Sequence, residues 1–489
     1  MQNAECRKSC GLDFISSADI KAFFGINFHF AKLYNPRHGV SSFIMHSAFY
    51  ILHYPKFSER ENVLSKQGDD YLPKPIYGCL GRHLSHSYSK EIHALLGDYA
   101  YELYPTEPEN LRDFIKNPYL QGVNVTIPYK KDVIKYLNRV DKAAKKIGAV
   151  NTIVSRDGKL YGYNTDVYGM ERLLQKNGIE LVGRKVLILG TGGTSLTAKY
   201  VCEKHAAREA LRVSRTKKPG VISYEEAVLY HTDAEVIINT TPVGMYPDNI
   251  GTSPISLEPF RLLQGVADAV YNPLRSALIL DAEKRGVKAG GGLYMLVNQA
   301  VKASELFTDT EIDDEKSDSV YNKIYTSKCN IVLTGMPACG KTTAAGILAE
   351  KTGREVFDTD TLCEQKENMS VSRIFAEKGE EYFRRLESEV IASLTPKTGV
   401  IISVGGGAVL KTENVDALKA NGLLFFIDRP LEKLLPTPDR PLASSADAIK
   451  KRYEERIDIY NSTADIKIIP SDNPNETADN ILKRLGDIK

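Results

Sequence analysis

The residues with the clearest chemical meaning form the run GMPACGKTT at 335–343. An apolar stretch at 331–333 precedes it, and the helix-period stretch TAAGILAEK follows. A glycine-rich loop of this spacing, between a strand and a helix, holds nucleotide phosphates on backbone N–H groups and on the helix N-terminus. Lys341 would neutralise phosphate oxygens, and the Thr342 hydroxyl could ligate Mg²⁺. The run therefore predicts a nucleoside triphosphate site, with a chance glycine-rich turn as the structural alternative.

Two carboxylates follow this loop in the segment VFDTDTL at 356–362. Because side chains alternate along a strand, Asp358 and Asp360 are expected on one face of a strand end. One carboxylate could serve Mg²⁺ through water while the other accepts a hydroxyl proton. The alternative is that both are solvated or cap a helix.

Candidate groups for an anionic substrate come next. The helical segment GEEYFRRLESE at 379–389 places Arg384 and Glu387 three residues apart, and an arginine fork suits a carboxylate ligand. A surface salt bridge is the alternative interpretation. Further on, the strand VIISV runs into three glycines at 405–407, where missing Cβ atoms let a small ligand approach the backbone.

A second nucleotide signal is KVLILGTGGTSLTA at 185–198, a buried-strand run that ends in a glycine turn and enters a helix. Its spacing is GxGGxx instead of the full G-x-G-x-x-G. A cofactor without a 2′-phosphate would call for Asp or Glu at the end of the next strand. The chain instead has ALRVSRTKK there, with Arg215, Lys217 and Lys218. These basic residues favour NADP over NAD; a solvated basic turn is the alternative.

Polar groups suited to carbonyl reduction precede this turn. Ser87 and Ser89 occupy alternate positions in SHSYSK, and Lys130 follows an expected strand at 123–127. Asp166 lies in GYNTDVYG. Reduction needs hydride at the carbonyl carbon and a positioned acid at the oxygen, and Lys130 held by Asp166 could be that acid. A surface lysine and a turn aspartate are the alternative.

The elements that must position these groups follow a regular rhythm. From about Ile76 to about Phe307, short apolar runs alternate with helix-period stretches, which favours parallel sheets covered by helices. The segment TDTEIDDEKSD at 308–318 carries six acidic residues and one lysine, and is expected to be a solvated linker. A second α/β pattern then begins at Cys329.

Composition limits the possible functions. The chain has 489 residues, a net charge of +2, and no apolar run long enough for a membrane span, so neither a nucleic acid nor a membrane partner is expected. Its seven cysteines are odd in number and scattered, which fits a reducing compartment. The start MQNAECRKSC lacks the features of a secretory signal. A cytoplasmic location is expected.

The ordered motifs of the C-terminal part resemble shikimate kinase over 329–488. The matching segments are GMPACGKTT, FDTDT, EYFRRLE, VGGGAV, DRPLA and RIDIY. The resemblance implies a shikimate site formed by Asp360, Arg384, Gly406, Gly407 and Arg456, with Asp360 as the base for the 3-hydroxyl. It also implies ATP contacts from Gly335, Gly340, Lys341, Thr342, Thr343 and the lid residue Arg440, and Mg²⁺ contacts from Thr342 and Asp358.

This part departs from the common family pattern at two positions. Ala338 stands where many relatives carry Gly, and Cys339 where Ser is frequent. A positive φ at Ala338 would cost about 1 kcal/mol.

The preceding part, over about 74–304, resembles shikimate dehydrogenase. The shared segments are SHSYSKEIH, GVNVTIPYK, GAVNT, NTDVYG, GTGGTS, SRT, NTTPVGM, VYNPLRSAL and GGLYMLVNQA. The resemblance implies substrate contacts from Ser87, Ser89, Thr126, Asn151, Asp166 and Gln299, with Lys130 and Asp166 as the catalytic pair. It implies NADP contacts from Gly190, Gly192, Gly193, Thr194, Ser214, Arg215, Thr216, Thr241 and Met245. Lys90 replaces the usual Pro, and Ser214 the usual Asn.

Together these observations predict an α/β enzyme that reduces 3-dehydroshikimate with NADPH and phosphorylates shikimate with ATP and Mg²⁺. The expected parts are an unassigned segment at 1–70, a substrate α/β domain at 71–175, a Rossmann NADP domain at 176–307 whose last helix returns to the substrate domain, an acidic linker at 308–328, and a P-loop kinase domain with a parallel sheet at 329–489.

Other interpretations remain open at this point. One is an NAD-preferring quinate/shikimate dehydrogenase fused to a kinase for another hydroxylated acid, which Arg215 and the set Asp360, Arg384 and Arg456 disfavour. Another is a regulatory protein that binds nucleotide and metabolite with decayed active sites. Residues 1–70 match neither half and could be an extra module, a fragment of a neighbouring pathway domain or a misassigned start. Oligomeric state and channelling of shikimate are not predicted.

Overall fold

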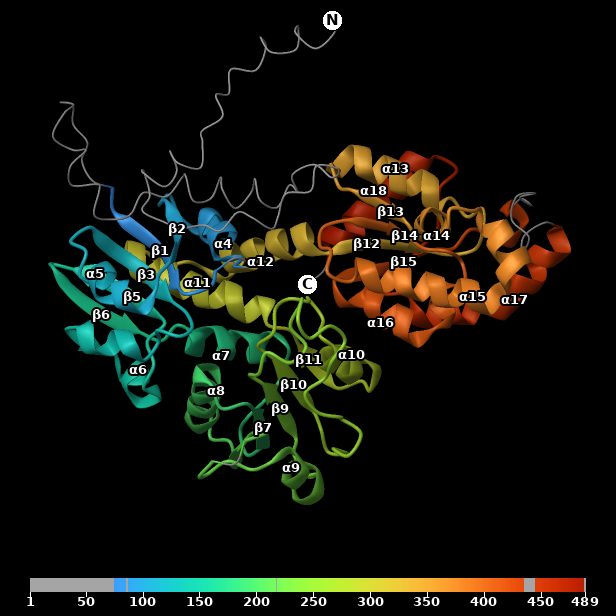
Figure 1. Ribbon diagram of the computed structural model, residues 1–489. Helices are drawn as coiled ribbons and strands as arrows, with labels where there is room; N and C mark the ends of the chain where they lie inside the picture. The colour runs from blue at the N-terminus through green and yellow to red at the C-terminus, as the bar shows by residue number, and fades with distance from the viewer. Residues whose placement is uncertain (1–73, 85–86, 217, 435–444, 488–489) are drawn as a thin grey trace, which may run out of the picture. The chain divides into compact units, whose positions relative to one another are not determined.

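The computed structural model describes residues 74–84, 87–216, 218–434 and 445–487 (Figure 1). The chain divides into two units, 1–72 and 73–489, and every element described below lies in the second. The unassigned segment at 1–70 and the expected lid residue Arg440 lie outside the described residues.

The first sheet is mixed. Its strands are β1 (Ile76–Gly81), β2 (Tyr101–Pro105), β3 (Leu120–Val125), β4 (Arg139–Val140), β5 (Thr152–Arg156) and β6 (Lys159–Tyr163), in the order β2-β1-β3-β5-β6-β4. Strand β5 is antiparallel to both β3 and β6, whereas β1 is parallel to β2 and β3. Helices α4 (Ser89–Leu96), α5 (Leu111–Ile115) and α6 (Lys142–Ile147) accompany this sheet. Leu80, Val123 and Ile153 are fully buried in its core.

The second sheet is wholly parallel, as expected for the NADP domain. Its strands are β7 (Lys185–Leu189), β8 (Glu209–Val213), β9 (Val236–Asn239), β10 (Gly265–Asp268) and β11 (Lys288–Gly290), in the order β11-β10-β9-β7-β8. The helices are α7 (Asp166–Lys176), α8 (Gly193–Lys204), α9 (Tyr224–Tyr230), α10 (Ala277–Lys284) and α11 (Leu293–Thr308). At the end of α11, Phe307 packs with Cys79 and Tyr101 of the first sheet.

The third sheet is also parallel. Its strands are β12 (Asn330–Thr334), β13 (Val356–Asp358), β14 (Ile401–Ser403), β15 (Gly422–Ile427) and β16 (Ile466–Ile468), in the order β13-β14-β12-β15-β16. Helices α13 (Lys341–Thr352), α14 (Thr359–Glu367), α15 (Val371–Leu394), α16 (Thr412–Ala420), α17 (Ala446–Thr463) and α18 (Pro474–Gly486) surround it. Short 3-10 helices occur at η2 (Pro108–Asn110), η3 (Asp132–Tyr136), η4 (Ala408–Leu410) and η5 (Leu431–Lys433).

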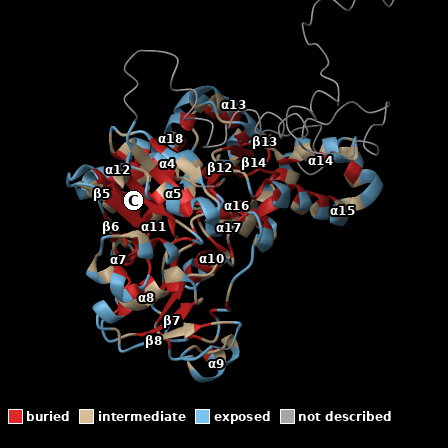
Figure 2. Ribbon diagram, turned by 60° about the vertical axis from the view of Figure 1, so that its left-hand side comes forward, coloured by how far each residue is buried: buried red, intermediate tan, exposed pale blue. Residues whose placement is uncertain are grey.

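Buried residues gather on the strands and on the inner faces of the helices, and the outer faces of the helices are exposed (Figure 2). Every residue of β7, β12 and β15 is buried. Continuous apolar runs of this kind are typical of parallel strands that are covered on both faces. The α/β fold class, with two parallel sheets, is therefore confirmed. None of the described helices combines the length and apolar character that a membrane crossing requires.

The expectation of a solvated linker at 308–328 is wrong for most of that segment. Asp309–Asp313 leads into helix α12 (Asp314–Lys328), in which Val320 and Ile324 are buried. The acidic residues gather at the helix N-terminus, where Asp313 caps the Lys316 N–H and negative charge is favoured. Apolar side chains four residues apart give the following turns one face that can pack.

Candidate active sites

A polar cavity lies where the first sheet, α7 and α11 meet. Its lining includes the expected residues Ser89, Thr126, Lys130, Asn151, Asp166, Thr194 and Gln299. Gln299 comes from α11, the helix that packs back onto the first sheet, so distant parts of the chain together form this cavity.

Lys130 and Asp166 form a close ion pair in the cavity. Lys130 Nζ lies 2.6 Å from Asp166 Oδ2, and the two side chains are only 20% and 12% exposed. Asn151 Nδ2 donates to the other carboxylate oxygen of Asp166 at 2.9 Å. The backbone of Lys130 is also fixed, because its carbonyl accepts from the Val150 N–H at 2.8 Å. A partly buried, held ammonium beside a carboxylate can donate a proton to a substrate oxygen.

The expected strand at 123–127 ends earlier than predicted. Strand β3 stops at Val125, and the following turn carries Lys130, while Ile127 is 80% exposed. Asp166 is the first residue of α7. The turn after β3 brings Lys130 to the helix N-terminus at Asp166, so the pair forms without either residue ending a strand.

The two serines have different positions. Ser89, the first residue of α4, is buried and lines the cavity. Ser87 is not in the lining, and its Oγ donates to Ser89 Oγ at 2.9 Å. Lys90, which departs from the family pattern, forms an exposed salt bridge with Glu102 at 2.6 Å. The departure therefore leaves Ser89 in place.

Sequence reasoning missed Asn124 and Tyr271, which also line the cavity. The buried Asn124 amide accepts from the Tyr101 hydroxyl at 2.7 Å and donates to Thr152 Oγ1 at 3.1 Å. Asn124 lies two residues before Thr126, so the period-two alternation of a strand could have placed both on one face. No local pattern marks Tyr271, which follows β10 more than a hundred residues later.

The glycine turn after β7 is open enough for a phosphate group. Gly190 has φ +112°, Gly192 caps α8, and a Cβ at Gly192 would meet no atom within 4 Å. A Cβ at Gly190 would lie 3.0 Å from Thr241, which places Thr241 beside the turn. A Cβ at Gly193 would lie 3.9 Å from Lys130 Cδ. The helix N-terminus, which attracts phosphate, thus adjoins the Lys130–Asp166 pair.

The basic residues lie beside this turn, at the end of the neighbouring strand. The Gly190 N–H donates to the Val213 carbonyl at 2.8 Å, which joins the ends of β7 and β8. Arg215 follows two residues later and is exposed, while Ser214 Oγ accepts from the Thr216 N–H at 3.1 Å. Lys218 Nζ donates to Thr191 Oγ1 at 3.0 Å. Met245 belongs to the loop after β9, where its N–H donates to the Pro242 carbonyl at 3.0 Å. The donor set fits a dinucleotide with a 2′-phosphate.

The phosphate loop between β12 and α13 has the expected geometry. Lys341 Nζ donates to the carbonyls of Gly335 and Met336, at 3.0 Å each, so its ammonium is held within the loop. Gly340 has φ +105°, and Ala338 has φ +63°. Ala338 therefore does adopt a positive φ, at a cost of about 1 kcal/mol. Thr342 and Thr343, at the start of α13, are exposed.

Asp358 and Asp360 do not share a strand face as predicted. Asp358 ends the strand and caps α14, accepting from the N–H groups of Asp360 at 3.1 Å and Thr361 at 3.2 Å. Asp360 lies in the first turn of that helix. Alternation ends at the cap, so the period-two argument does not extend to Asp360. Both residues nevertheless line one pocket together with Thr342.

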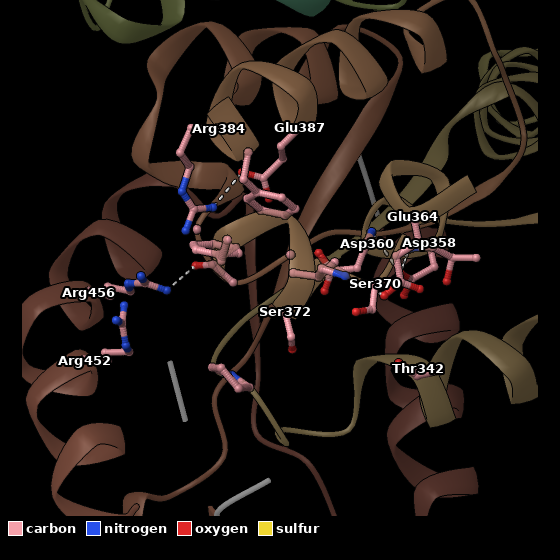
Figure 3. Close-up of a pocket in the computed structure, with 18 residues that line it drawn as sticks. Thr342, Asp358, Asp360, Glu364, Ser370, Ser372, Arg384, Glu387, Arg452 and Arg456 are labelled. Carbon is pink, nitrogen blue, oxygen red and sulfur yellow. Dashed lines mark hydrogen bonds and ion pairs between the residues drawn. The ribbon is translucent and has the colours of Figure 1, made fainter. Parts of the chain in front are cut away.

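This pocket has a cationic end and an acidic end (Figure 3). Arg384, Arg452 and Arg456 lie at one end, on α15 and α17, and Asp358, Asp360 and Thr342 lie at the other. A hydroxylated acid could place its carboxylate among the guanidinium groups and a hydroxyl near the acidic residues.

The glycines after β14 make room for these charged groups. A Cβ at Gly407 would lie 2.2 Å from Arg384 Nη1, and one at Gly405 would lie 2.7 Å from Asp360 Oδ1. The Gly406 carbonyl accepts from Arg456 Nη1 at 3.1 Å. Arg456 is buried, so this contact fixes its guanidinium at the pocket wall.

Arg452, one helical turn before Arg456, is a pocket residue that sequence reasoning missed. Burial and the adjacent Arg456 lower the pKa of Arg452 from its ordinary value, because like charges repel. Glu380 and Glu455 offset part of this repulsion, and an anion that enters the pocket would offset more. The sequence signal that could have identified Arg452 is its position four residues before Arg456, because residues at this spacing lie on the same face of a helix.

Few protein groups are available to a metal ion. In the described ranges, no three or more His, Cys, Asp or Glu side chains are grouped so that they could hold one. Thr342 and Asp358 therefore fit Mg²⁺ only together with phosphate oxygens and water, which is how Mg²⁺ commonly binds at nucleotide sites.

The fold and the two sites define an α/β dehydrogenase joined to a P-loop kinase. The family model of the shikimate dehydrogenase substrate binding domain matches residues 79–153, and that of shikimate kinase matches residues 337–486. Shikimate dehydrogenase (NADP(+)) of Clostridium beijerinckii is 37% identical over 262 residues, which cover 50% of this chain and 97% of the relative. The same enzyme of Dehalococcoides mccartyi is 40% identical over 271 residues, covering 49% and 92%.

Two solved structures are similar to part of the chain. Shikimate dehydrogenase 1 of Peptoclostridium difficile is 37% identical with a TM-score of 0.47, covering 51% of this chain and 97% of that one. A chorismate mutase/shikimate 5-dehydrogenase fusion protein of Clostridium acetobutylicum is 36% identical with a TM-score of 0.49, covering 52% and 97%. The identity to the curated relatives, over more than nine tenths of their length, shows that the chain belongs to the shikimate dehydrogenase family. With its shikimate kinase domain, it is a bifunctional enzyme of the shikimate pathway.

Proposed function

We propose that the Lys130 cavity reduces 3-dehydroshikimate to shikimate with NADPH, and that the arginine-lined pocket phosphorylates shikimate with ATP and Mg²⁺. The observation that carries the proposal is the 2.6 Å ion pair between Lys130 and Asp166 beside a dinucleotide turn, in one chain with the phosphate loop. Bound NADPH would supply hydride to the carbonyl carbon of the substrate.

In the reductase, the Lys130 ammonium gives its proton to the carbonyl oxygen as the alcohol forms, and regains a proton from solvent. Asp166 keeps the ammonium oriented, and Asn151 keeps Asp166 oriented. Ser89, Thr126 and Gln299, which line the cavity, would bind the substrate's hydroxyl and carboxylate groups. Arg215 would select NADP by taking the 2′-phosphate, with Ser214 and Thr216 beside it.

In the kinase, the 3-hydroxyl oxygen of shikimate attacks the γ-phosphorus of ATP, and ADP leaves. Asp360 accepts the proton that this hydroxyl loses. Arg384 and Arg456 hold the shikimate carboxylate, while Gly406 and Gly407 allow the ring to approach the backbone. Lys341 stabilises the negative charge of the phosphates. Thr342 and Asp358 would hold Mg²⁺ with those phosphates.

The expected domain boundaries are part of the proposal: a substrate domain at 71–175, an NADP domain at 176–307 and a kinase domain at 329–489. The mixed sheet and the two parallel sheets support them. A cytoplasmic location is also proposed, because Cys79, Cys202, Cys329, Cys339 and Cys363 are all free thiols.

The test uses the purified full-length protein. With 3-dehydroshikimate, NADPH absorbance should fall; with shikimate and Mg·ATP, ADP should form. With all substrates present, shikimate 3-phosphate should accumulate from 3-dehydroshikimate. Binding of NADPH and ATP without turnover of either substrate would instead favour a regulatory protein with decayed sites.

A further inference from the structure

A largely buried arginine of the dehydrogenase is held by backbone and carboxylate groups of the kinase. Arg275 lies between β10 and α10, and its Nη1 and Nη2 donate to Asp465 Oδ1 at 2.9 Å and Oδ2 at 3.0 Å. Its Nε donates to the Lys419 carbonyl at 3.0 Å, and Nη2 to the Gly422 carbonyl at 2.6 Å. The Arg275 side chain is 14% exposed, so this is a desolvated contact and not a rim salt bridge.

The backbone on both sides is paired as well. The Arg275 N–H donates to the Ala420 carbonyl at 2.8 Å, and the Leu274 N–H donates to Asn421 Oδ1 at 3.0 Å. Asn421 is itself fixed, because its Nδ2 donates to the Thr395 carbonyl at 3.1 Å. Every residue of the kinase segment 419–422 therefore accepts a hydrogen bond from Leu274 or Arg275, and Asp465 accepts the charge-assisted fork.

Charge at this contact is balanced, because the cations Arg275 and Lys419 face two carboxylates, Asp465 and Glu283, whose Oε2 lies 3.6 Å from Arg275 Nη1. Burial alone would raise the pKa of Asp465, but Arg275 and Lys419 hold it below its usual value. Lys419 Nζ also lies 3.0 Å from Asp465 Oδ1. Apolar packing continues beside the polar contact, since Leu274 and Val297 share one buried cluster with Val332 and Leu424 of the kinase sheet.

The same dehydrogenase loop forms a wall of the reductase cavity. Ala269 and Tyr271 line that cavity, a few residues before Arg275. The loop begins at the buried Asp268, whose Oδ2 accepts from Ser276 Oγ at 2.6 Å and whose Oδ1 accepts from Asn239 Nδ2 at 2.9 Å. One short loop therefore contacts the reductase cavity on one side and the kinase on the other.

We propose that the kinase segment 419–422 and Asp465 form a docking surface for the dehydrogenase loop 269–275, and that this contact positions the Tyr271 wall of the reductase cavity. The kinase domain thereby stabilises the conformation of the reductase active site, and the two halves unfold as one cooperative unit. The docking surface itself does not depend on the proposed reactions; the kinetic readout below does, and failure of those reactions would appear in the unsubstituted protein.

The test compares three full-length variants with the unsubstituted protein. Arg275→Met removes the fork, and Asp465 keeps Lys419 as a partner. Asp465→Asn is nearly isosteric and serves if Arg275→Met does not fold. Lys284→Met is the matched control, because Lys284 and Asp416 form a pair across the same two halves at 2.7 Å but are 47% and 37% exposed.

Calorimetry should give one unfolding transition for the unsubstituted protein, and both NADP⁺ and Mg·ADP should raise its Tm. The reason is that a bound ligand stabilises the whole cooperative unit that contains its site. Arg275→Met should give two transitions, each raised by one ligand. It should also raise KM for 3-dehydroshikimate roughly three- to tenfold, about 0.7–1.4 kcal/mol, with kinase kcat/KM unchanged. Two independent transitions in the unsubstituted protein, or equal behaviour of Arg275→Met and Lys284→Met, would overturn the proposal.

Discussion

Arg384 Nη1 lies 2.7 Å from Glu387 Oε2, one turn apart on the pocket side of α15. Glu387 is 1% exposed, and its Oε1 has no hydrogen-bond partner among the described residues. Burial raises the pKa of Glu387 to about 7, although Arg384 opposes the rise. The arginine proposed to bind the substrate carboxylate is therefore held by a carboxyl group that changes charge near neutral pH.

This pair predicts a pH-dependent affinity for shikimate. Above about pH 7 the ionised Glu387 competes with the substrate for Arg384, so KM for shikimate should rise as pH rises through about 7. Burial also links the charge of Glu387 to the stability of the fold, because its pKa is higher in the folded than in the unfolded chain, where it is 4.5. The stability that the protonated form contributes is fully present below pH 4.5 and is lost as pH rises through about 7. Kinetics from pH 6 to 8 should show the effect, and Glu387→Gln should abolish it. An unchanged pH profile in that variant would rule out Glu387 as the titrating group.

Gly407→Ala should weaken shikimate binding. The new Cβ would lie 2.2 Å from Arg384 Nη1, so the guanidinium must move away from its present position. We expect KM for shikimate to rise by roughly tenfold, about 1.4 kcal/mol, with little change in KM for ATP. Gly346→Ala on α13 is the control, because a Cβ there meets no atom within 4 Å. Equal KM values in the two variants would contradict the proposed place of the carboxylate.

Arg452 should contribute to substrate affinity without taking part in phosphoryl transfer. Arg452→Gln removes one of three cations at the carboxylate end of the pocket, so KM for shikimate should rise several-fold while kcat stays within about twofold. Arg385→Gln is the control, since Arg385 is 61% exposed and pairs with Glu381. A loss of kcat without a change in KM would mean that Arg452 acts on the phosphates instead.

Arg215 should set the cofactor preference. Arg215→Ala removes the guanidinium proposed for the 2′-phosphate, and should raise KM for NADPH by roughly tenfold or more, about 1.4 kcal/mol, with little effect on NADH. Arg208→Ala, at the other end of β8 where Arg208 pairs with Glu235, should leave both constants unchanged. Equal effects of Arg215→Ala on the two cofactors would assign Arg215 a structural role.

The sequence predicted the class of fold because its signals are local. Buried apolar strands, glycine turns and helix-period stretches follow one another at short range, and the parallel sheets that they indicate are present. The Lys130–Asp166 pair and the position of Lys341 within its loop also agree with expectation.

The predictions that were wrong, and the contact that was not predicted, depended on geometry that extends beyond a single helix or strand. Asp360 was expected on a strand, but the cap formed by Asp358 starts a helix before it. The segment at 308–328 was expected to be solvated because of its many acidic residues. These residues lie at its start, whereas the short apolar face of α12 lies in the later turns. The Arg275–Asp465 contact joins residues 190 positions apart, and no local pattern specifies such a contact.

Separate loss of the two activities tests the presence of two independent active sites most directly. The measurement is kcat/KM for each half-reaction on the purified full-length protein and on its Lys130→Ala and Lys341→Ala variants. Lys130→Ala should abolish reduction of 3-dehydroshikimate and leave phosphorylation of shikimate within a few-fold, and Lys341→Ala should do the converse. Loss of both activities from either substitution in a folded protein would contradict two separate sites.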